Sequence, residues 1–346
     1  MSAYAIVGSP PPDQPPSPLK RATVHKHDHS PGHDGCGEKD CAGGEAPRPI
    51  VTPGDVVELV PGMQDIYIVG TVDGFGKVTK ITGLEPELTL RSCLIEKMEN
   101  LETLTELERL ELYDNQILTL ADLTPFKKLR ILDMSYNLIK STAAAAACPL
   151  LEELYVAQNR LRSIEGLEGL TKLKKLDLGA NRIRSMDGVQ HCSALEELWL
   201  GKNKIEAITG LEHMPKLRRL DVQSNRLTEI SGLQAVTELQ ELYLAHNAIA
   251  RIEGLGALTQ LSTLDVSSNR IASISGLESL GELTDLWMSS NGIATFEEVA
   301  KLGAVLPSLD CLYLEHNPIY RDFEYRKRIA QLLPKLTQLD ATPVRR

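Results

Sequence analysis

Aromatic residues are scarce in this chain: they make up 4% of its 346 residues, with four Phe and only two Trp. No stretch of about 18 consecutive apolar residues occurs, which predicts that no helix of the chain spans a membrane. The first residues lack a basic segment followed by an apolar stretch, so we expect no secretory signal peptide. N-x-S/T sequons are missing too. These absences favour a protein that resides inside the cell.

Paired cysteines are also lacking over most of the chain. Of the six cysteines, Cys36 and Cys41 lie close together, whereas the other four are scattered without the paired spacing of a disulfide framework. Scattered cysteines are typical of reduced thiols in a reducing compartment. We therefore expect the protein in the nucleus and cytoplasm.

Positive charge is outweighed by negative charge, with 37 Lys and Arg against 47 Asp and Glu and a net charge of −10. A nucleic-acid backbone is a poor partner for such a chain, and a protein with a basic surface is a better one. Catalytic motifs such as H-E-x-x-H and G-x-S-x-G are absent. The segment 70–78 resembles a P-loop, but its spacing is one residue too long and no Ser or Thr follows Lys77. We expect neither enzymatic activity nor a required cofactor.

The dominant feature that is present is an internal repeat. Asparagine recurs every 22 residues from Asn115 to Asn291, and a last one, Asn317, follows after 26. Around each stands the pattern L-x-x-L-x-L-x-x-N-x-L/I, as in LKKLDLGANRI (173–183). This period and pattern are the leucine-rich-repeat signature. The sequence therefore predicts an α/β repeat fold, a leucine-rich-repeat solenoid.

Each part of the repeat has a physical reason. The L-x-L segment predicts a short parallel strand on the concave side, with leucines pointing into the core. The asparagine amide is expected to satisfy backbone groups that the bend leaves unpaired. Recurrent glycines such as Gly166 and Gly188 predict tight turns or 3₁₀ segments on the convex side. Cys93, one period before Asn115, is expected to replace asparagine in the core.

The repeats also suggest the organisation of the whole chain. Residues 73–317 are predicted to form about eleven repeats, preceded by an N-terminal cap at 51–72 and followed by a C-terminal cap at 318–346. The C-terminal cap is expected to contain a short helix with Ile329, Leu332 and Leu333 on one face. Residues 1–50 hold nine of the nineteen prolines and few apolar residues, which predicts a disordered tail.

One residue per repeat is expected to point outward between the two strand leucines, four positions before the asparagine. We call these residues the central column: Glu111, Asp133, Tyr155, Asp177, Trp199, Asp221, Tyr243, Asp265, Trp287 and Tyr313. Acids alternate with aromatics, and the column holds both tryptophans of the chain. Exposed aromatics cost solubility unless a partner covers them, and Tyr and Trp are common interface anchors. The column therefore predicts a protein-binding surface.

The positions six before each asparagine form a second outward row, which we call the flanking column. Its composition is mixed, and it is expected to add specificity: Arg109, Ile131, Glu153, Lys175, Glu197, Arg219, Glu241, Thr263, Asp285 and Cys311.

Local strings add a more specific resemblance over about 55–346. LYDNQI (112–117), LGKNKI (200–205), QSNRLT (223–228) and the C-terminal stretch EHNPIYRDFEYRKRIAQLLPKLTQLDATPVR resemble the Sds-type family of leucine-rich-repeat regulatory subunits of protein phosphatase-1, the regulatory subunit 7 family. The resemblance implies a non-enzymatic subunit that binds the phosphatase-1 catalytic subunit with its concave face and controls its activity or assembly.

The resemblance also implies which residues bind the partner. Asp133, Asp265, Trp287 and Tyr313 match the family's contacts in type. Tyr155 and Trp199 stand where relatives have Phe, and Asp177 and Asp285 where relatives more often have Glu. These departures keep aromaticity or charge, so they bear on affinity rather than on the mode of binding. Asp221 and Tyr243 are added from the periodicity of the column.

The tail contains a second candidate site. Half of the histidines lie within 25–33, and Cys36 and Cys41 follow. Two imidazoles and two thiolates, from His29, His33, Cys36 and Cys41, are a candidate zinc set, although the C-x₄-C spacing is loose. The string GCGEKDC (35–41) also resembles a stretch of phosphatase-1 inhibitor-3, which is thus a further candidate partner. Two other functions stay open: a leucine-rich-repeat adaptor of another complex, for example in an axoneme, and a metal carrier that uses the tail.

Overall fold

The computed structural model describes residues 23–25, 56–59, 80–81, 87–92, 95–98, 101 and 104–344. Three short strands on the N-terminal side, β1 (Thr23–His25), β2 (Val56–Leu59) and β3 (Lys80–Ile81), form a small sheet in the order β1-β2-β3. The candidate zinc ligands, Cys93, the P-loop-like segment and most of the expected tail and N-terminal cap lie outside the described residues.

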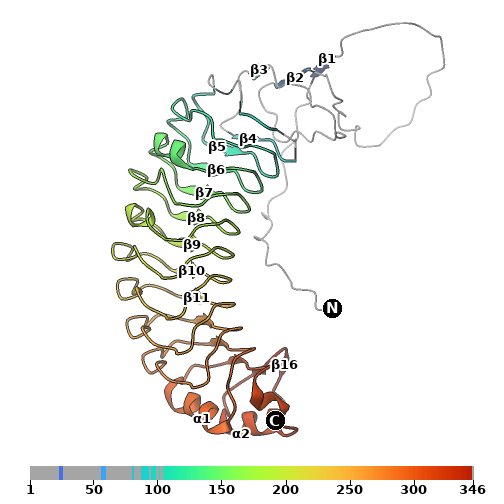
Figure 1. The fold of residues 1–346 in the computed structure, drawn as a ribbon, viewed down its shortest axis with the longest axis vertical. Coiled ribbons are helices and arrows are strands. Elements are labelled where there is room, and N and C mark those ends of the chain that lie inside the picture. Colours follow the sequence, from blue (N-terminus) through green and yellow to red (C-terminus); the bar gives the residue numbers. More distant parts are fainter. Residues whose placement is uncertain are drawn as a thin grey trace, which may run out of the picture.

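The remaining strands form one sheet of thirteen strands, ordered along the chain from β4 to β16. Figure 1 shows them stacked into a curved solenoid with the strands on the inner side of the arc. Each strand from β4 to β14 pairs in parallel with the strand that follows it. The last strand, β16, pairs antiparallel with β15. The strands are β4 (Glu87–Thr89), β5 (Arg109–Glu111), β6 (Ile131–Asp133), β7 (Glu153–Tyr155), β8 (Lys175–Asp177), β9 (Glu197–Trp199), β10 (Arg219–Asp221), β11 (Glu241–Tyr243), β12 (Thr263–Asp265), β13 (Asp285–Trp287), β14 (Cys311–Tyr313), β15 (Gln338–Leu339) and β16 (Thr342–Pro343). The predicted leucine-rich-repeat solenoid is confirmed.

The register of the sheet follows the 22-residue period without slippage. Leu198 pairs with Leu220, and Leu220 pairs with Leu242, so the central leucines of successive strands stack on one another. These leucines are fully buried and belong to one continuous hydrophobic core. A one-residue slip would turn every leucine toward water, so burial of this row fixes the register.

The asparagine ladder forms as predicted. The Asn203 side chain donates to the carbonyls of Leu178 and Leu200 at 3.0 Å each, and its Oδ1 accepts the Ile183 N–H at 3.0 Å. The equivalent bonds recur along the array as far as Asn317. Each asparagine thus satisfies buried backbone groups of its own repeat and of the preceding one.

The convex side consists mostly of turns with a few short helices. Two 3₁₀ helices, η1 (Ala143–Ala147) and η2 (Val189–His191), lie on this side. The glycines of the return segment adopt left-handed backbone angles, as Gly276 does with φ 72°. A Cβ at Gly276 would lie 2.2 Å from the Ile252 carbonyl oxygen, so no side chain fits there. The predicted tight turns are therefore present, and 3₁₀ helices occur in only some repeats.

The C-terminal end is covered by a cap, as predicted. The longer last repeat accommodates α1 (Phe296–Val305), and the chain continues through η3 (Pro318–Arg321) and α2 (Tyr325–Leu332) into β15. In α2, Ile329 is fully buried. Arg328 lies over the Phe296 ring, 3.5 Å from its centroid, and joins the two α-helices. These contacts cover the leucines that the last repeat would otherwise expose.

Candidate protein-binding face

The central column lies on adjacent strands of the concave sheet, as the periodicity predicts. Strand pairing places Asp177 beside Tyr155 and Trp199, and Asp221 beside Trp199 and Tyr243. The nine members from Asp133 to Tyr313 are half-buried rather than fully exposed. Glu111 is buried and forms ion pairs with Arg91 and Arg109. The structure thus brings the predicted residues together on one face, but their side chains are only partly exposed there.

The aspartates of the column have a structural role that the sequence analysis missed. The Asp177 Oδ1 accepts the backbone N–H of Gly179 at 2.8 Å, and the Asp221 Oδ1 accepts that of Gln223 at 2.9 Å. Asp133 and Asp265 make the same bond to the residue two positions on. This is the Asx-turn geometry, in which a carboxylate caps the backbone as it leaves the strand. The Asp-x-Gly and Asp-x-Ser spacing was the signal available in the sequence.

Asp177 differs from the other three aspartates. Gln223 Nε2 donates to the second oxygen of Asp221 at 2.9 Å. Side-chain hydrogen bonds from Ser135 and Ser267 reach Asp133 and Asp265. At Asp177 the corresponding residue is a glycine, and the backbone N–H of Gly179 is its one hydrogen bond within the described chain. Asp177 therefore has an oxygen left for a partner.

Burial raises the pKa of all four aspartates. The pKa of the Asp177 carboxyl rises from 3.8 to about 6, first because of desolvation and further because of the nearby charges of Asp221 and Asp133. The pKa values of Asp133, Asp221 and Asp265 are raised as well, with desolvation as the largest cause. A basic side chain placed beside these carboxylates would favour their charged form.

The aromatic members of the column differ in their contacts. The Tyr155 and Tyr243 hydroxyls donate to Glu153 and Glu241, at 2.9 and 2.7 Å. Trp287 packs between two rings, 6.2 Å from Tyr243 and 6.1 Å from Tyr313. Its Nε1 is buried and points toward the Cys311 thiol of the neighbouring strand.

The flanking column carries alternating charges that pair across strands. Lys175 lies 3.7 Å from both Glu153 and Glu197, and Arg219 lies 3.7 Å from Glu197 and 2.7 Å from Glu241. These side chains are partly exposed, so each pair adds little stability. Most charged side chains of the flanking column are nevertheless paired with one another. The aspartates of the central column are therefore the acids more available to a basic partner.

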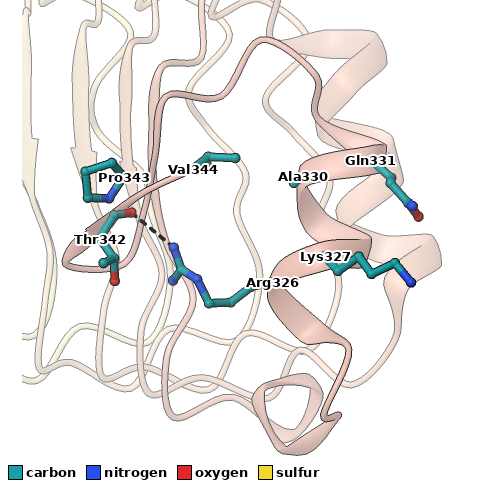
Figure 2. A pocket seen from close by; sticks show the side chains of 7 residues that line it. All are labelled: Arg326, Lys327, Ala330, Gln331, Thr342, Pro343 and Val344. Carbon is teal, nitrogen blue, oxygen red and sulfur yellow. Dashed lines mark hydrogen bonds between the residues drawn. The ribbon is translucent and has the colours of Figure 1, made fainter. Parts of the chain in front are cut away.

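A pocket also lies in the C-terminal cap, away from the central column. Figure 2 shows it between α2 and the final hairpin, with Arg326, Lys327 and Ala330 on one side and Thr342, Pro343 and Val344 on the other. The Arg326 guanidinium donates to the carbonyls of Leu339 and Thr342, at 3.0 and 3.1 Å. It therefore serves to hold the hairpin against the helix.

Within the described residues, no group of three or more His, Cys, Asp or Glu side chains is arranged to hold a metal ion. None of the helices in the described part of the chain is sufficiently long and apolar to span a membrane.

Comparison with known families identifies leucine-rich repeats in the centre of the chain. A model of paired leucine-rich repeats matches residues 149–191 and 237–279, and a second leucine-rich-repeat model matches residues 171–227. No curated protein matches the chain. These segments are leucine-rich repeats, the class of repeat that generally mediates protein–protein interaction.

Solved structures with the same fold come from proteins of different kinds. An internalin, InlF from Listeria monocytogenes, is 25% identical with a TM-score of 0.58, and the match covers 75% of this chain and 83% of that one. The functional domain of InlJ from the same organism is 22% identical with a TM-score of 0.60, over 74% of this chain and 62% of that one. A plant peptide hormone receptor, RGFR1 in complex with RGF2, is 22% identical with a TM-score of 0.58, over 75% of this chain and 44% of that one. At this level of identity the similarity establishes the fold.

Proposed function

We propose that this protein is a non-catalytic regulatory or scaffold subunit that binds the catalytic subunit of protein phosphatase-1 with its concave face. The observation that carries the proposal is the central column, in which aromatics and carboxylates alternate on adjacent strands. Its ten strands are about 4.8 Å apart and therefore span on the order of 45 Å. That length suffices for an interface of about 1,600 Å², the standard size for a specific complex.

The chemistry of the column favours a partner with a basic surface. Four aspartates are held half-buried, and among the described residues no Lys or Arg forms an ion pair with them at the distances found in the flanking column. A Lys or Arg of the partner would stabilise the charged form of these carboxylates, which burial disfavours. The neighbouring rings of Tyr155 and Trp199 offer flat apolar surface and cation–π contacts.

The repeat class supports a role in protein binding, and the resemblance to the phosphatase-1 regulatory family supplies the choice of partner. Cys148, Cys192 and Cys311 are buried and unpaired, which is compatible with the proposed nuclear and cytoplasmic location. An adaptor of another complex is the alternative that the experiment distinguishes.

The test measures binding of the full chain to the purified phosphatase-1 catalytic subunit by calorimetry. The wild type is expected to bind, and Trp199→Ala/Trp287→Ala is expected to weaken binding at least tenfold, because each lost anchor costs about 1–2 kcal/mol or more. Asp133→Asn/Asp177→Asn should weaken binding less and reduce its salt dependence, since Asn retains the acceptor for the backbone N–H but removes the charge.

The matched control is Leu118→Ala/Phe323→Ala, which removes two large exposed apolar side chains outside the central column. This variant should bind like the wild type, and circular dichroism should show that all variants are folded. Failure of the wild type to bind would point to an adaptor with a different partner. Equal binding by the folded tryptophan variant would contradict the role of the central column.

A further inference from the structure

Basic side chains of this acidic chain gather in two rows at the edge of the concave sheet. The first row occupies the position directly after the ladder asparagine in three successive repeats, and the second row occupies the position three after it, beginning one repeat earlier. We call these residues the basic edge: Arg160, Arg182 and Lys204 in the first row, and Lys140, Arg162 and Arg184 in the second. The Lys204 side chain is partly exposed and the others are exposed.

Backbone hydrogen bonds between repeats hold the two rows in register. The Arg160 N–H donates to the Ile139 carbonyl at 2.8 Å, the Arg182 N–H donates to the Leu161 carbonyl at 2.9 Å, and the same bond recurs at Lys204. Leu161, which lies between the two rows, is fully buried, so the side chains before and after it point to solvent on the same face. Successive repeats are about 4.8 Å apart, and the basic edge therefore extends over about 14 Å.

The basic edge lacks the counter-charges that other cations of the solenoid have. Arg130 and Lys174 both lie 2.8 Å from Glu152, whereas within the described residues no ion pair is formed by any member of the basic edge. Like charges on adjacent repeats repel one another. An anionic group bound along the two rows would relieve this repulsion.

The acids beside the basic edge are already bound to other groups. The two carboxylate oxygens of Glu165 accept hydrogen bonds from the hydroxyls of Ser141 and Ser163, at 2.7 Å each. Glu206, which follows Arg184 in the second row, lies 3.8 Å from Arg226. The chain therefore does not neutralise these cations locally, and their donors are available to a ligand.

We propose that the basic edge binds a short acidic segment of a partner protein, laid in extended form along the solenoid. An extended chain advances about 3.3 Å per residue, so about five residues cover the two rows, and alternate side chains face the same way about 6.6 Å apart. Four members of the basic edge are arginines, whose guanidinium groups bind carboxylates through paired hydrogen bonds. A segment with acids at alternate positions is the chemistry that fits.

Two features favour a protein segment over a nucleic acid. The two rows carry no aromatic side chain on which bases could stack. The net charge of −10 opposes a long polyanion, whereas a short segment interacts mainly with the cations next to it, because salt screens the more distant charges. The basic edge lies beyond the asparagine turn and not on the strands of the central column, so both surfaces can be occupied together. The inference therefore does not depend on phosphatase-1.

The test measures binding of the full chain to a fluorescein-labelled octapeptide in which glutamate and serine alternate, by fluorescence anisotropy and without any phosphatase. One variant removes the arginines of the basic edge: Arg160→Gln/Arg162→Gln/Arg182→Gln/Arg184→Gln. The matched control has the same net charge but loses exposed cations elsewhere: Lys172→Gln/Lys216→Gln/Arg218→Gln/Arg251→Gln. Circular dichroism checks that both variants are folded, which we expect because every substituted side chain is exposed.

We expect the wild type and the control to bind the peptide alike, and the edge variant to bind it about tenfold more weakly, because each exposed ion pair contributes only a little. Binding should also weaken as salt is added. No binding by the wild type, equal binding by the folded edge variant, or an equal loss in both variants overturns the proposal. Tighter binding of a single-stranded oligonucleotide of the same length, or of phosphatidylserine vesicles, also overturns it, because the ligand would then not be an acidic protein segment.

Discussion

At the scale of single residues, the aspartates of the central column serve the fold and the surface together. One oxygen of each caps the backbone N–H two residues on, while the carboxylate as a whole stays half-buried on the concave side. If these side chains only capped the turn, asparagine would serve equally well, because its side-chain oxygen accepts the same backbone hydrogen bond. The negative charge therefore needs a second reason, and the basic partner proposed above would provide one.

Asp177 should make the stability of the free protein depend on pH. Its pKa is raised from 3.8 to about 6, so between these values the folded chain binds a proton that the unfolded chain does not. Its contribution therefore falls as the pH rises through about 6, and the ionised carboxylate is a cost at neutral pH. We expect Asp177→Asn to raise the free energy of unfolding at pH 7.5 by roughly 1–2 kcal/mol.

Urea denaturation of wild type and variant between pH 5 and 7.5 measures this effect. The difference should shrink steadily toward pH 5, where the wild-type carboxyl is protonated. Asp187→Asn, at an exposed carboxyl, is the control and should change little. A difference independent of pH would show that ionisation of Asp177 is not its cause.

At the scale of the element, each repeat consists of a three-residue strand and a return turn. Such a unit is too short to fold alone. Three residues give few ladder hydrogen bonds, and the strand is held instead by its neighbours and by the asparagine of the next repeat. The return turn is fixed by a glycine whose left-handed angle and close contact with the preceding repeat admit no side chain.

The glycine turns should be intolerant of the smallest substitution. Gly276→Ala puts a Cβ within 2.2 Å of the Ile252 carbonyl oxygen at φ 72°, so we expect a loss of about 2 kcal/mol or more. Gly281→Ala is the matched control in the same repeat, because nothing lies within 4 Å of its Cβ. Thermal melting followed by circular dichroism compares the two, and equal melting temperatures would refute this account of the turn.

At the scale of the whole molecule, the solenoid is close to one-dimensional, since each repeat contacts mainly the repeats before and after it. Its cooperativity depends on the interfaces between repeats. A destabilising substitution in the middle of the array should therefore affect the cooperativity of unfolding differently from an equally destabilising one near one end.

Leu220 on β10 and Leu110 on β5 occupy the same position of the repeat, and both are fully buried. Each Leu→Ala substitution should cost about 2–5 kcal/mol. We expect Leu220→Ala to separate the unfolding transitions of the two flanking halves, and Leu110→Ala to leave them together. Single-tryptophan variants that retain Trp199 or Trp287 report on the two halves during urea unfolding. Coincident transitions in Leu220→Ala would argue for cooperativity across the whole array.

The sequence by itself determined the repeat, its register, the asparagine ladder and the set of residues that share the concave face. It could do so because one period, read nine times at a fixed step, defines which side chains stack. The tertiary structure decided what those side chains do there. Half-burial of the central column, the Asx turns, the pairing of the flanking charges and the open oxygen of Asp177 depend on contacts between neighbouring strands and turns. Such contacts follow from side-chain rotamers and from the small residues beside them, such as Gly179 and Gly201, and the hydrophobic period carries no information about either.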